Sequence, residues 1–378
     1  MELLNATKMK AAYTMGMKPD GRELLVVVVK GTFKIPNDPN QKPELADEQA
    51  DLVMADEFTG EPGFSAPIYE SDFAPMKPRC DVILNGTAYA PQGKLMAHVP
   101  VALRVGSMRK AFNVVGNRVW RLGLFGVVAT IPEPFLTMPI SYDNAFGGVD
   151  NSHENPKRHA ALAENPVGRG FHVNMARDAI EGKPLPNTEA AGRAVRSPRV
   201  KYRPMAFGPV GRNWQPRQRY GGTYDQNWID NVFPFLPADF DNQYYQCAPK
   251  DQQLDRLNGG EEVVLFNLTP RGQTRFRLPM IEVPVTFYRK NGGEVATGTV
   301  LDTLVIEPDL NRFMLAWRIA LPLKRNMFEI EQVVVGRMTR AWYRARQLGK
   351  AYYSSLEELL SERRAQREEA QLLEEIES

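Results

Sequence analysis

Hydrophobic residues along this chain gather in short runs that glycine and proline interrupt, a pattern typical of strands joined by turns. The clearest run, Glu23 to Ile35 (ELLVVVVKGTFKI), is dominated by valine and predicts a buried strand. Further runs, separated by turn sequences at Pro91-Gln92-Gly93 and Gly106-Ser107, predict a β-meander. Its strands are expected at Cys80 to Ala90, Lys94 to Val105 and Arg109 to Arg121.

Strand-like runs return in the last third of the chain, at 261–268, 279–290, 294–306 and 311–321. Asn291-Gly292 lies between two of these runs and favours a hairpin, because the central residues of such a tight turn adopt positive φ. From about Arg340 onward, alanine, leucine and arginine dominate, and this composition predicts helix.

The whole pattern predicts a mainly β fold of two β-rich lobes joined by a loop-rich middle region and followed by C-terminal helices. Glycine and proline, 29 of each in 378 residues, favour short strands over a helical bundle. The expected boundaries are an N-terminal β lobe at 1–130, a loop-rich connecting region at 131–260, a second β lobe at 261–325 and a helical segment at 326–378.

The most unusual stretch is Gly222 to Gln252 (GTYDQNWIDNVFPFLPADFDNQYYQCAPKDQ), which holds seven aromatic residues, three prolines and five aspartates but one lysine. No helix or strand period runs through it. Exposed aromatic rings are costly in water, so the stretch is expected to pack as a long ordered loop. Ordered loops of this length often serve a function.

The rings of this region are therefore the expected functional centre, with an internal staple between the two lobes as the equal alternative. A second candidate is the distal end of the C-terminal helix, where apolar residues return after a polar stretch and either contact a partner or fray. The candidate partner-binding residues are Trp214, Trp228, Phe233, Phe235, Tyr244, Leu372, Leu373 and Ile376.

Charge and cysteine content narrow the class of protein. The net charge is +2, but eight acids gather between Asp38 and Glu61, and eight basic residues with no acid between Arg193 and Arg219. These are solvated loops or separate docking patches. The chain has two cysteines, no apolar segment long enough to span a bilayer and no signal-peptide pattern in its first residues. A cytoplasmic protein without a membrane partner is expected.

A search for catalytic or ligand-binding motifs finds none. No phosphate-binding glycine loop is present. The histidines lack partners at metal-ligand spacing, so no metal or other cofactor is expected. Cys247 is expected to be a small buried filler, although a cysteine–histidine nucleophile that uses Cys80 or Cys247 stays open. Asp239 and Asp241 fail the calcium-loop pattern; they are either turn-capping residues or the paired carboxylates of a glycosidase.

The basic stretch from Arg193 to Arg219 is interleaved with Tyr202, Phe207 and Trp214, a combination that single-stranded nucleic acid can bind. The nearly neutral net charge argues against nucleic acid as the main partner. Trp214, Trp228 and Tyr244 are also the residue types of a carbohydrate-binding platform. These binding functions are kept as alternatives.

Several blocks taken in order resemble one bacterial family, long labelled a domain of unknown function. The resemblance covers roughly Leu24 to Ser355, and its members are encoded beside toxic effectors of the type VI secretion system. The blocks are DVILNGTAYAP (81–91), VGNRVW (115–120), YDNAFGG (142–148), NPVGRGF (165–171), LPN (185–187), GPVGRNWQPR (208–217), the ring-rich stretch, GGE (259–261) and NLTP (267–270).

The resemblance implies a non-enzymatic adaptor or chaperone. Such a protein binds its cognate effector, often one with a PAAR or Rhs region, in the cytoplasm and helps load it onto the valine–glycine-repeat spike. The family motifs carry no catalytic residues, so none is assigned here. The alternative functions are a glycan-acting hydrolase that uses Asp239 and Asp241, and a carbohydrate- or nucleic-acid-binding module.

Overall fold

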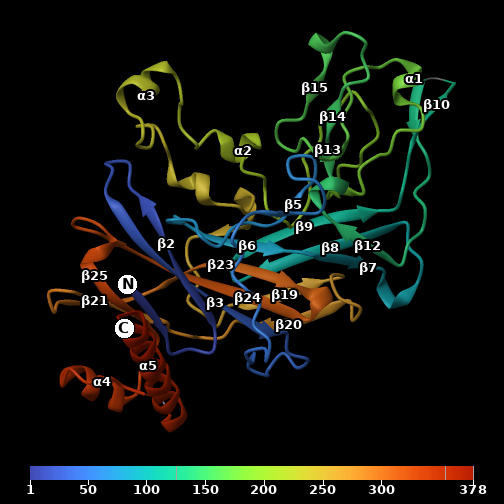
Figure 1. Cartoon of the computed structure of the whole chain (residues 1–378). Helices are drawn as coiled ribbons and strands as arrows, with labels where there is room; N and C mark the ends of the chain where they lie inside the picture. The colour runs from blue at the N-terminus through green and yellow to red at the C-terminus, as the bar shows by residue number, and fades with distance from the viewer. Residues whose placement is uncertain (125, 354, 378) are drawn as a thin grey trace. The chain divides into compact units, whose positions relative to one another are not determined.

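The computed structural model describes residues 1–124, 126–353 and 355–377. The chain forms two compact units, Met1–Val335 and Gly336–Ser378 (Figure 1). Strands dominate the first unit and helices the second, so the expectation of a mainly β protein with C-terminal helices is confirmed. Among the described residues, none of the helices combines the length and the apolar character needed to cross a bilayer.

A six-stranded sheet is built around the valine-rich run, which forms strand β3 (Glu23–Lys34). Alternate residues of β3 point to opposite faces of the sheet. Leu25, Val27 and Val29 enter the main core. Leu24, Val26 and Val28 form a second cluster on the other face, with Leu52 packed against it. Burial on both faces explains why this strand is continuously apolar. The order is β18 (Gln253–Leu254), β6 (Cys80–Leu84), β23 (Val300–Glu307), β24 (Arg312–Pro322), β3 and β2 (Lys10–Met17).

A five-stranded antiparallel sheet faces the same core with one side. Along its strand β8 (His98–Val105), every second residue from Val99 to Val105 is buried, as expected for a sheet with one face in the core. Its hairpin turn at Gly106 agrees with the sequence prediction, whereas the partner strand ends at Val115, before the predicted end at Arg121. The order is β17 (Thr188–Ala190), β9 (Met108–Val115), β8, β19 (Glu262–Phe266) and β20 (Gln273–Arg277).

A four-stranded sheet brings the start of the first unit beside its end. Strand β25 lies inside the segment predicted to be helical, and this prediction is wrong for residues 330–335. The run IEQVVV there pairs in parallel with β1 and antiparallel with β21, so tertiary pairing decides its structure. The order is β1 (Glu2–Asn5), β25 (Ile330–Val335), β21 (Pro284–Arg289) and β22 (Glu294–Gly298).

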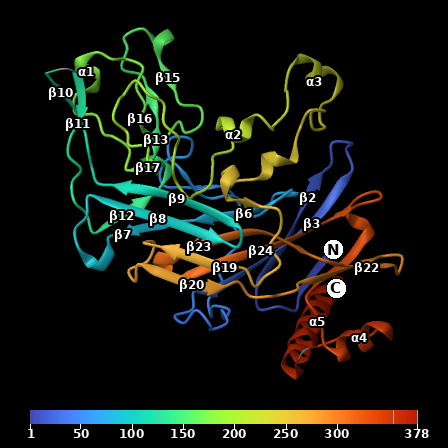
Figure 2. The ribbon, with the colours of Figure 1, turned by 180° about the vertical axis from the view of Figure 1, so that it is seen from behind.

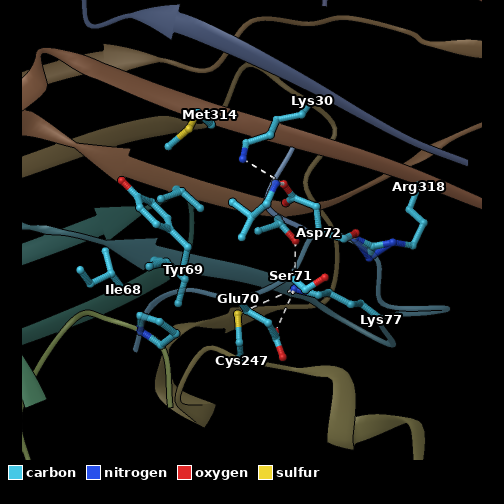
Figure 3. A pocket seen from close by; sticks show the side chains of 15 residues that line it. Lys30, Ile68, Tyr69, Glu70, Ser71, Asp72, Lys77, Cys247, Met314 and Arg318 are labelled. Carbon is cyan, nitrogen blue, oxygen red and sulfur yellow. Dashed lines mark hydrogen bonds and ion pairs between the residues drawn. The ribbon is translucent and has the colours of Figure 1, made fainter. Parts of the chain in front are cut away.

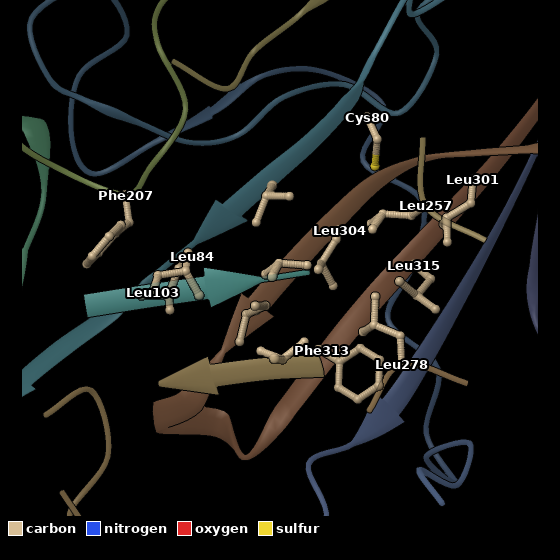
Figure 4. Packing of buried hydrophobic residues seen from close by; sticks show 14 of the residues in the cluster. Cys80, Leu84, Leu103, Phe207, Leu257, Leu278, Leu301, Leu304, Phe313 and Leu315 are labelled. Atoms are coloured by element: carbon tan, nitrogen blue, oxygen red, sulfur yellow. The ribbon is translucent and has the colours of Figure 1, made fainter. Parts of the chain in front are cut away.

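Buried side chains of all three sheets meet in one hydrophobic core. Leu84, Leu304 and Phe313 of the six-stranded sheet share it with Leu103 of the five-stranded sheet (Figure 4). Strand β23 lies parallel to β6, and β19 pairs with β8, so strands from residues 1–130 and 261–325 belong to the same sheets. The strands are therefore not arranged as the two separate lobes that the sequence suggested.

The middle region, residues 131–260, contains only short elements, the longest of which is the six-residue helix α3. The α-helices of this region are α1 (Arg177–Ile180), α2 (Gln215–Gln218) and α3 (Gln226–Asn231).

Several two-stranded ribbons complete the first unit. The ribbons pair β4 (Glu57–Phe58) with β5 (Pro67–Tyr69), β7 (Gly86–Tyr89) with β12 (Thr137–Ile140), β10 (Trp120–Gly123) with β11 (Gly126–Ala129), β13 (Phe146–Gly147) with β16 (Arg169–Gly170), and β14 (Val149–Asp150) with β15 (Ala160–Ala161).

The second unit consists of helices α4 (Arg340–Gln347) and α5 (Leu356–Glu377). The side chain of Thr339 begins α4 by accepting a hydrogen bond of 3.2 Å from the main-chain N–H of Trp342. Its hydroxyl also lies 3.2 Å from the hydroxyl of Tyr352, after the end of the same helix. The unit therefore consists of two successive helices, the first of which has its own local cap.

Candidate protein-binding site

Residues 222–240, here called the ring arm, form an ordered loop that includes helix α3. The Asp225 carboxylate accepts a hydrogen bond of 2.9 Å from the main-chain N–H of Trp228 and so begins the helix. The indole N–H of Trp228 donates a hydrogen bond of 2.9 Å to the main-chain carbonyl of Phe235. The arm is thus braced across its width, and it projects from the sheets on the side of β2 in both views (Figures 1 and 2).

Aromatic rings fill the inside of the ring arm and cover its outside. Trp228, half-buried, is in edge-to-face contact with Tyr224 at 4.7 Å and with Phe233 at 5.6 Å between ring centroids. Phe233 is nevertheless 67% exposed and Phe235 45% exposed, and Tyr224 and Ile229 are each more than half exposed. The arm therefore presents an apolar surface that its own fold does not cover.

Two aspartates order the chain at the end of the ring arm. Asp239 accepts hydrogen bonds from the main-chain N–H of Thr223 at 2.9 Å and from its hydroxyl at 2.7 Å, which closes the arm. Asp241 accepts from the main-chain N–H of Gln243 at 2.8 Å and begins the short helix Asn242–Tyr245. The hydrogen bonds from Thr223 also lower the pKa of Asp239, the opposite of what a general acid requires. Both carboxylates act as turn and helix caps.

The remaining ring candidates lie in the segments that flank the ring arm, residues 210–221 and 241–245, here called its base. Trp214 is buried and is in edge-to-face contact with Tyr142 at 5.3 Å. Tyr244 is half-buried, with the guanidinium of Arg217 5.7 Å from its ring centre. The five predicted ring residues thus divide into two in the base, one inside the arm and two, Phe233 and Phe235, on its exposed side.

Buried ion pairs hold this base against the segment that precedes β6. Arg217 is buried, and its guanidinium lies 2.5 Å from the Glu70 carboxylate while donating to the main-chain carbonyls of Tyr244 and Val210. Arg212 also pairs with Glu70, at 2.9 Å, and binds Asp56 at 2.6 Å. Burial alone would raise the pKa of Asp56, but the hydrogen bonds from Arg212 and Ser71 hold it below its usual value.

The chain that follows the arm is fixed to β6 by one carboxylate. Asp81, fully buried, accepts hydrogen bonds from the main-chain N–H groups of Cys247 at 2.9 Å and Ala248 at 3.1 Å. The Lys77 ammonium lies 2.8 Å from the same carboxylate. Burial lowers the pKa of Lys77, but the attraction of Asp81 and nearby acids outweighs it and keeps the ammonium charged.

A cavity of about 30 Å³ beside these groups has room for water but not for an organic substrate (Figure 3). Ligand atoms of Glu70, Asp81 and Cys247 lie within 4.8 Å of one another, a spacing that would suit a metal ion. The Lys77 ammonium already lies among them and supplies the positive charge. Burial raises the pKa of Cys247 well above its ordinary value, so its thiol is neither a ready metal ligand nor a ready nucleophile.

Of the three rings interleaved with the basic stretch, Tyr202 is half-buried, with the Arg193 guanidinium 5.7 Å from its ring centre. Phe207 and Trp214 are buried in the core. Arg212 and Arg217 are engaged with carboxylates, and Arg203 binds Asp251 at 2.8 Å. Three of the eight basic residues of this stretch, Arg203, Arg212 and Arg217, are therefore paired with acids that are distant along the chain.

Two exposed members of the surface, Tyr224 and Ile229, were not among the residues singled out from the sequence. The Asp225-to-Trp228 spacing of a helix cap was the available signal, because it places Ile229 on a short helix beside the rings. Leu372, Leu373 and Ile376 are placed on the backbone of α5, but their side chains lie outside the described residues.

These features define a mainly β protein with an ordered, ring-rich loop whose flanking segments are held by ion pairs. The chain belongs to the family described as "Uncharacterized protein conserved in bacteria (DUF2169)", whose model matches residues 20–318. The comparisons with curated proteins and with solved structures each gave no significant match.

Proposed function

We propose that this protein is a non-enzymatic adaptor that holds another protein against the ring arm. The observation that carries the proposal is the exposure of Phe233, Phe235, Tyr224 and Ile229 on a loop that is fixed by hydrogen bonds. Exposed aromatic clusters on rigid supports are typical of protein interfaces, because little conformational freedom is lost on binding.

The charge around these rings describes the partner. Asp225 and Asp230 flank the exposed side chains, and the sequence from Tyr220 to Pro249 contains no lysine or arginine. An apolar patch bordered by basic residues on the partner would match this surface in both shape of contact and sign of charge.

The resemblance described above supplies the identity of the partner. We infer a type VI secretion effector, of the PAAR or Rhs kind, which the adaptor binds in the cytoplasm and helps load onto the valine–glycine-repeat spike. The membership in an uncharacterised bacterial family supports a bacterial setting and adds nothing about the cargo. A rigid, exposed apolar loop supports a non-covalent holding role in which no bond is made or broken.

Co-purification of the full-length protein with the full-length effector encoded beside it tests the proposal. We expect a stable complex that Phe233→Ser weakens at least about tenfold, the usual loss for a central interface aromatic. Phe328→Ser is the matched control, because Phe328 is also 67% exposed but lies outside the arm. It should change the affinity by less than about threefold. Failure of the two full-length proteins to associate would count decisively against the adaptor function.

A further inference from the structure

Strand β2 is an open edge of the six-stranded sheet. Among the described residues it pairs with one strand only, β3, in an unbroken register from Lys10↔Lys30 to Met17↔Glu23. It is eight residues long, which is long for an edge, and its other side faces no strand. Open edges of this kind offer a row of backbone donors and acceptors to any extended chain.

The register shows which backbone groups face outward. The main-chain N–H of Lys18 donates to the carbonyl of Arg22, so the backbone N–H and C=O groups of Lys18 face the β3 side of the hairpin. The direction of the backbone N–H and C=O groups alternates along a strand. Those of Gly16 and Thr14 therefore also face β3, whereas those of Met15 and Tyr13 face away from it. The outward-facing N–H and C=O groups therefore belong to Ala11, Tyr13, Met15 and Met17.

This edge lacks the features that usually prevent pairing. Between Ala11 and Met17 there is no charged residue and no proline, and the register carries no bulge. Tyr13 and Met15, each 37% exposed, present a ring and a flexible thioether side chain beside the open backbone groups. An added strand would therefore find both hydrogen bonds and apolar contacts here.

The open edge is continuous with the ring arm. At the turn between β2 and β3, Gly21 has a φ of +81° and lies directly under the Phe235 ring. A Cβ atom at Gly21 would lie 2.6 Å from Cε1 of Phe235, so no other residue fits there without displacing the ring. The exposed rings thus begin where the open strand ends.

We propose that an extended segment of the bound effector adds to the sheet as a strand along β2, with its neighbouring residues lying on the ring arm. The proposal rests on the adaptor function proposed above and names how the cargo is held. Main-chain pairing supplies affinity for an extended chain of varied sequence, and the ring arm supplies the side-chain contacts that select it. A partner of this kind fits the open donors, the uncharged edge and the adjoining apolar surface together.

Hydrogen exchange resolved to single amides tests the pairing in the complex of full-length protein and full-length neighbouring effector. We expect the amides of Ala11, Tyr13, Met15 and Met17 to exchange at least about tenfold more slowly in the complex than in the free protein. The amides of Ala12 and Thr14, already bonded to β3, serve as internal controls and should change much less. A complex that forms without protecting the outward amides would overturn strand addition and leave the adaptor function standing.

A pair of substitutions at one position separates backbone from side-chain binding. Met15→Pro removes an outward N–H without breaking a bond to β3, whereas Met15→Ala keeps the N–H and shortens the side chain. We expect Met15→Pro to weaken effector binding at least about tenfold and Met15→Ala to weaken it less than about threefold. Equal effects of the two substitutions would contradict backbone pairing, and the hydrogen-exchange result decides the matter if Met15→Pro lowers the stability of the free protein.

The molar mass of the free protein decides between a cargo segment and a second copy of this chain. A monomer whose outward amides are unprotected is expected. A concentration-dependent dimer that protects the same four amides would show that β2 pairs with itself, which would overturn the proposed occupant. A complete absence of complex with the effector would overturn both this proposal and the adaptor function.

Discussion

Two lysine–aspartate pairs of almost equal length differ in burial, and burial determines how much each ion pair is expected to contribute to the free energy of unfolding. Lys77 and Asp81 lie 2.8 Å apart with both side chains buried, whereas Lys34 and Asp47 lie 2.7 Å apart at the surface. Water screens the second pair and can replace either partner. Asp81 is fully buried and also accepts hydrogen bonds from the chain that follows the ring arm.

Replacing Asp81 by asparagine should therefore lower the free energy of unfolding by about 3 kcal/mol, because the Lys77 ammonium would stay buried without its closest counter-charge. The control is Asp47→Asn, which should leave the urea midpoint nearly unchanged because its ion pair is exposed to water. Urea unfolding of the two variants at neutral pH measures the difference. Similar midpoints for both variants would show that the buried pair does not hold the base of the arm.

At the same scale, residue type did not determine which rings would be exposed. Trp214 and Phe233 belong to neighbouring ring-rich blocks, yet Trp214 is buried against Tyr142 and Phe233 is exposed. What separates them is the partner each meets from elsewhere in the chain. Composition alone indicated an ordered ring-rich segment, and only the tertiary structure showed which part of that segment faces outward.

Short elements of the middle region are held together by individual side chains instead of long ladders. Strand β14 has two residues, and its Asp150 carboxylate accepts hydrogen bonds from the main-chain N–H groups of Val173 and Asn174 and from the Ser152 hydroxyl. Burial would raise the pKa of Asp150, but these hydrogen bonds lower it to about 2. The charged carboxylate thus joins β14 to the loop after β16.

This arrangement predicts an acid dependence of stability. Because the folded pKa of Asp150 lies below its ordinary value of 3.8, its contribution is present above that pH and is lost as the pH falls toward 2. Asp150→Asn should lower stability at neutral pH and flatten the decrease between these two values. Urea midpoints measured for both proteins across this range test it, and parallel pH profiles would show that Asp150 titrates as it does in the unfolded chain.

Local pattern predicted individual strands better than their partners. The valine-rich run and the strand β24 (Arg312–Pro322) were placed within two residues, since each has a strong apolar pattern. The predicted strand 294–306 is instead β22 and β23, which diverge after Gly298 into different sheets. The predicted meander is also divided, because β6 pairs with β23, more than 200 residues away. Such long-range pairing leaves no mark in a single sequence.

The whole molecule is organised around a core that closes within its first unit. Among the described residues, each hydrophobic cluster, including the one between the three large sheets, is made of residues that precede Gly336. The parallel pairing of β1 with β25 brings the first residues of the unit beside its last strand. The unit therefore contains its own core and both ends of its own sheet.

A chain that ends at Val335 is accordingly expected to fold cooperatively, with a thermal midpoint within a few degrees of the full-length value, because these hydrophobic clusters stay intact. Calorimetry on both proteins measures this.

The same truncation separates the two candidate binding surfaces. If the ring arm and β2 hold the effector, the shortened protein keeps its affinity. Loss of binding by a folded Met1–Val335 unit would instead place the interface on the C-terminal helices, which carry the candidate partner-binding residues Leu372, Leu373 and Ile376. An unfolded or aggregated product would show that the core depends on residues beyond Val335.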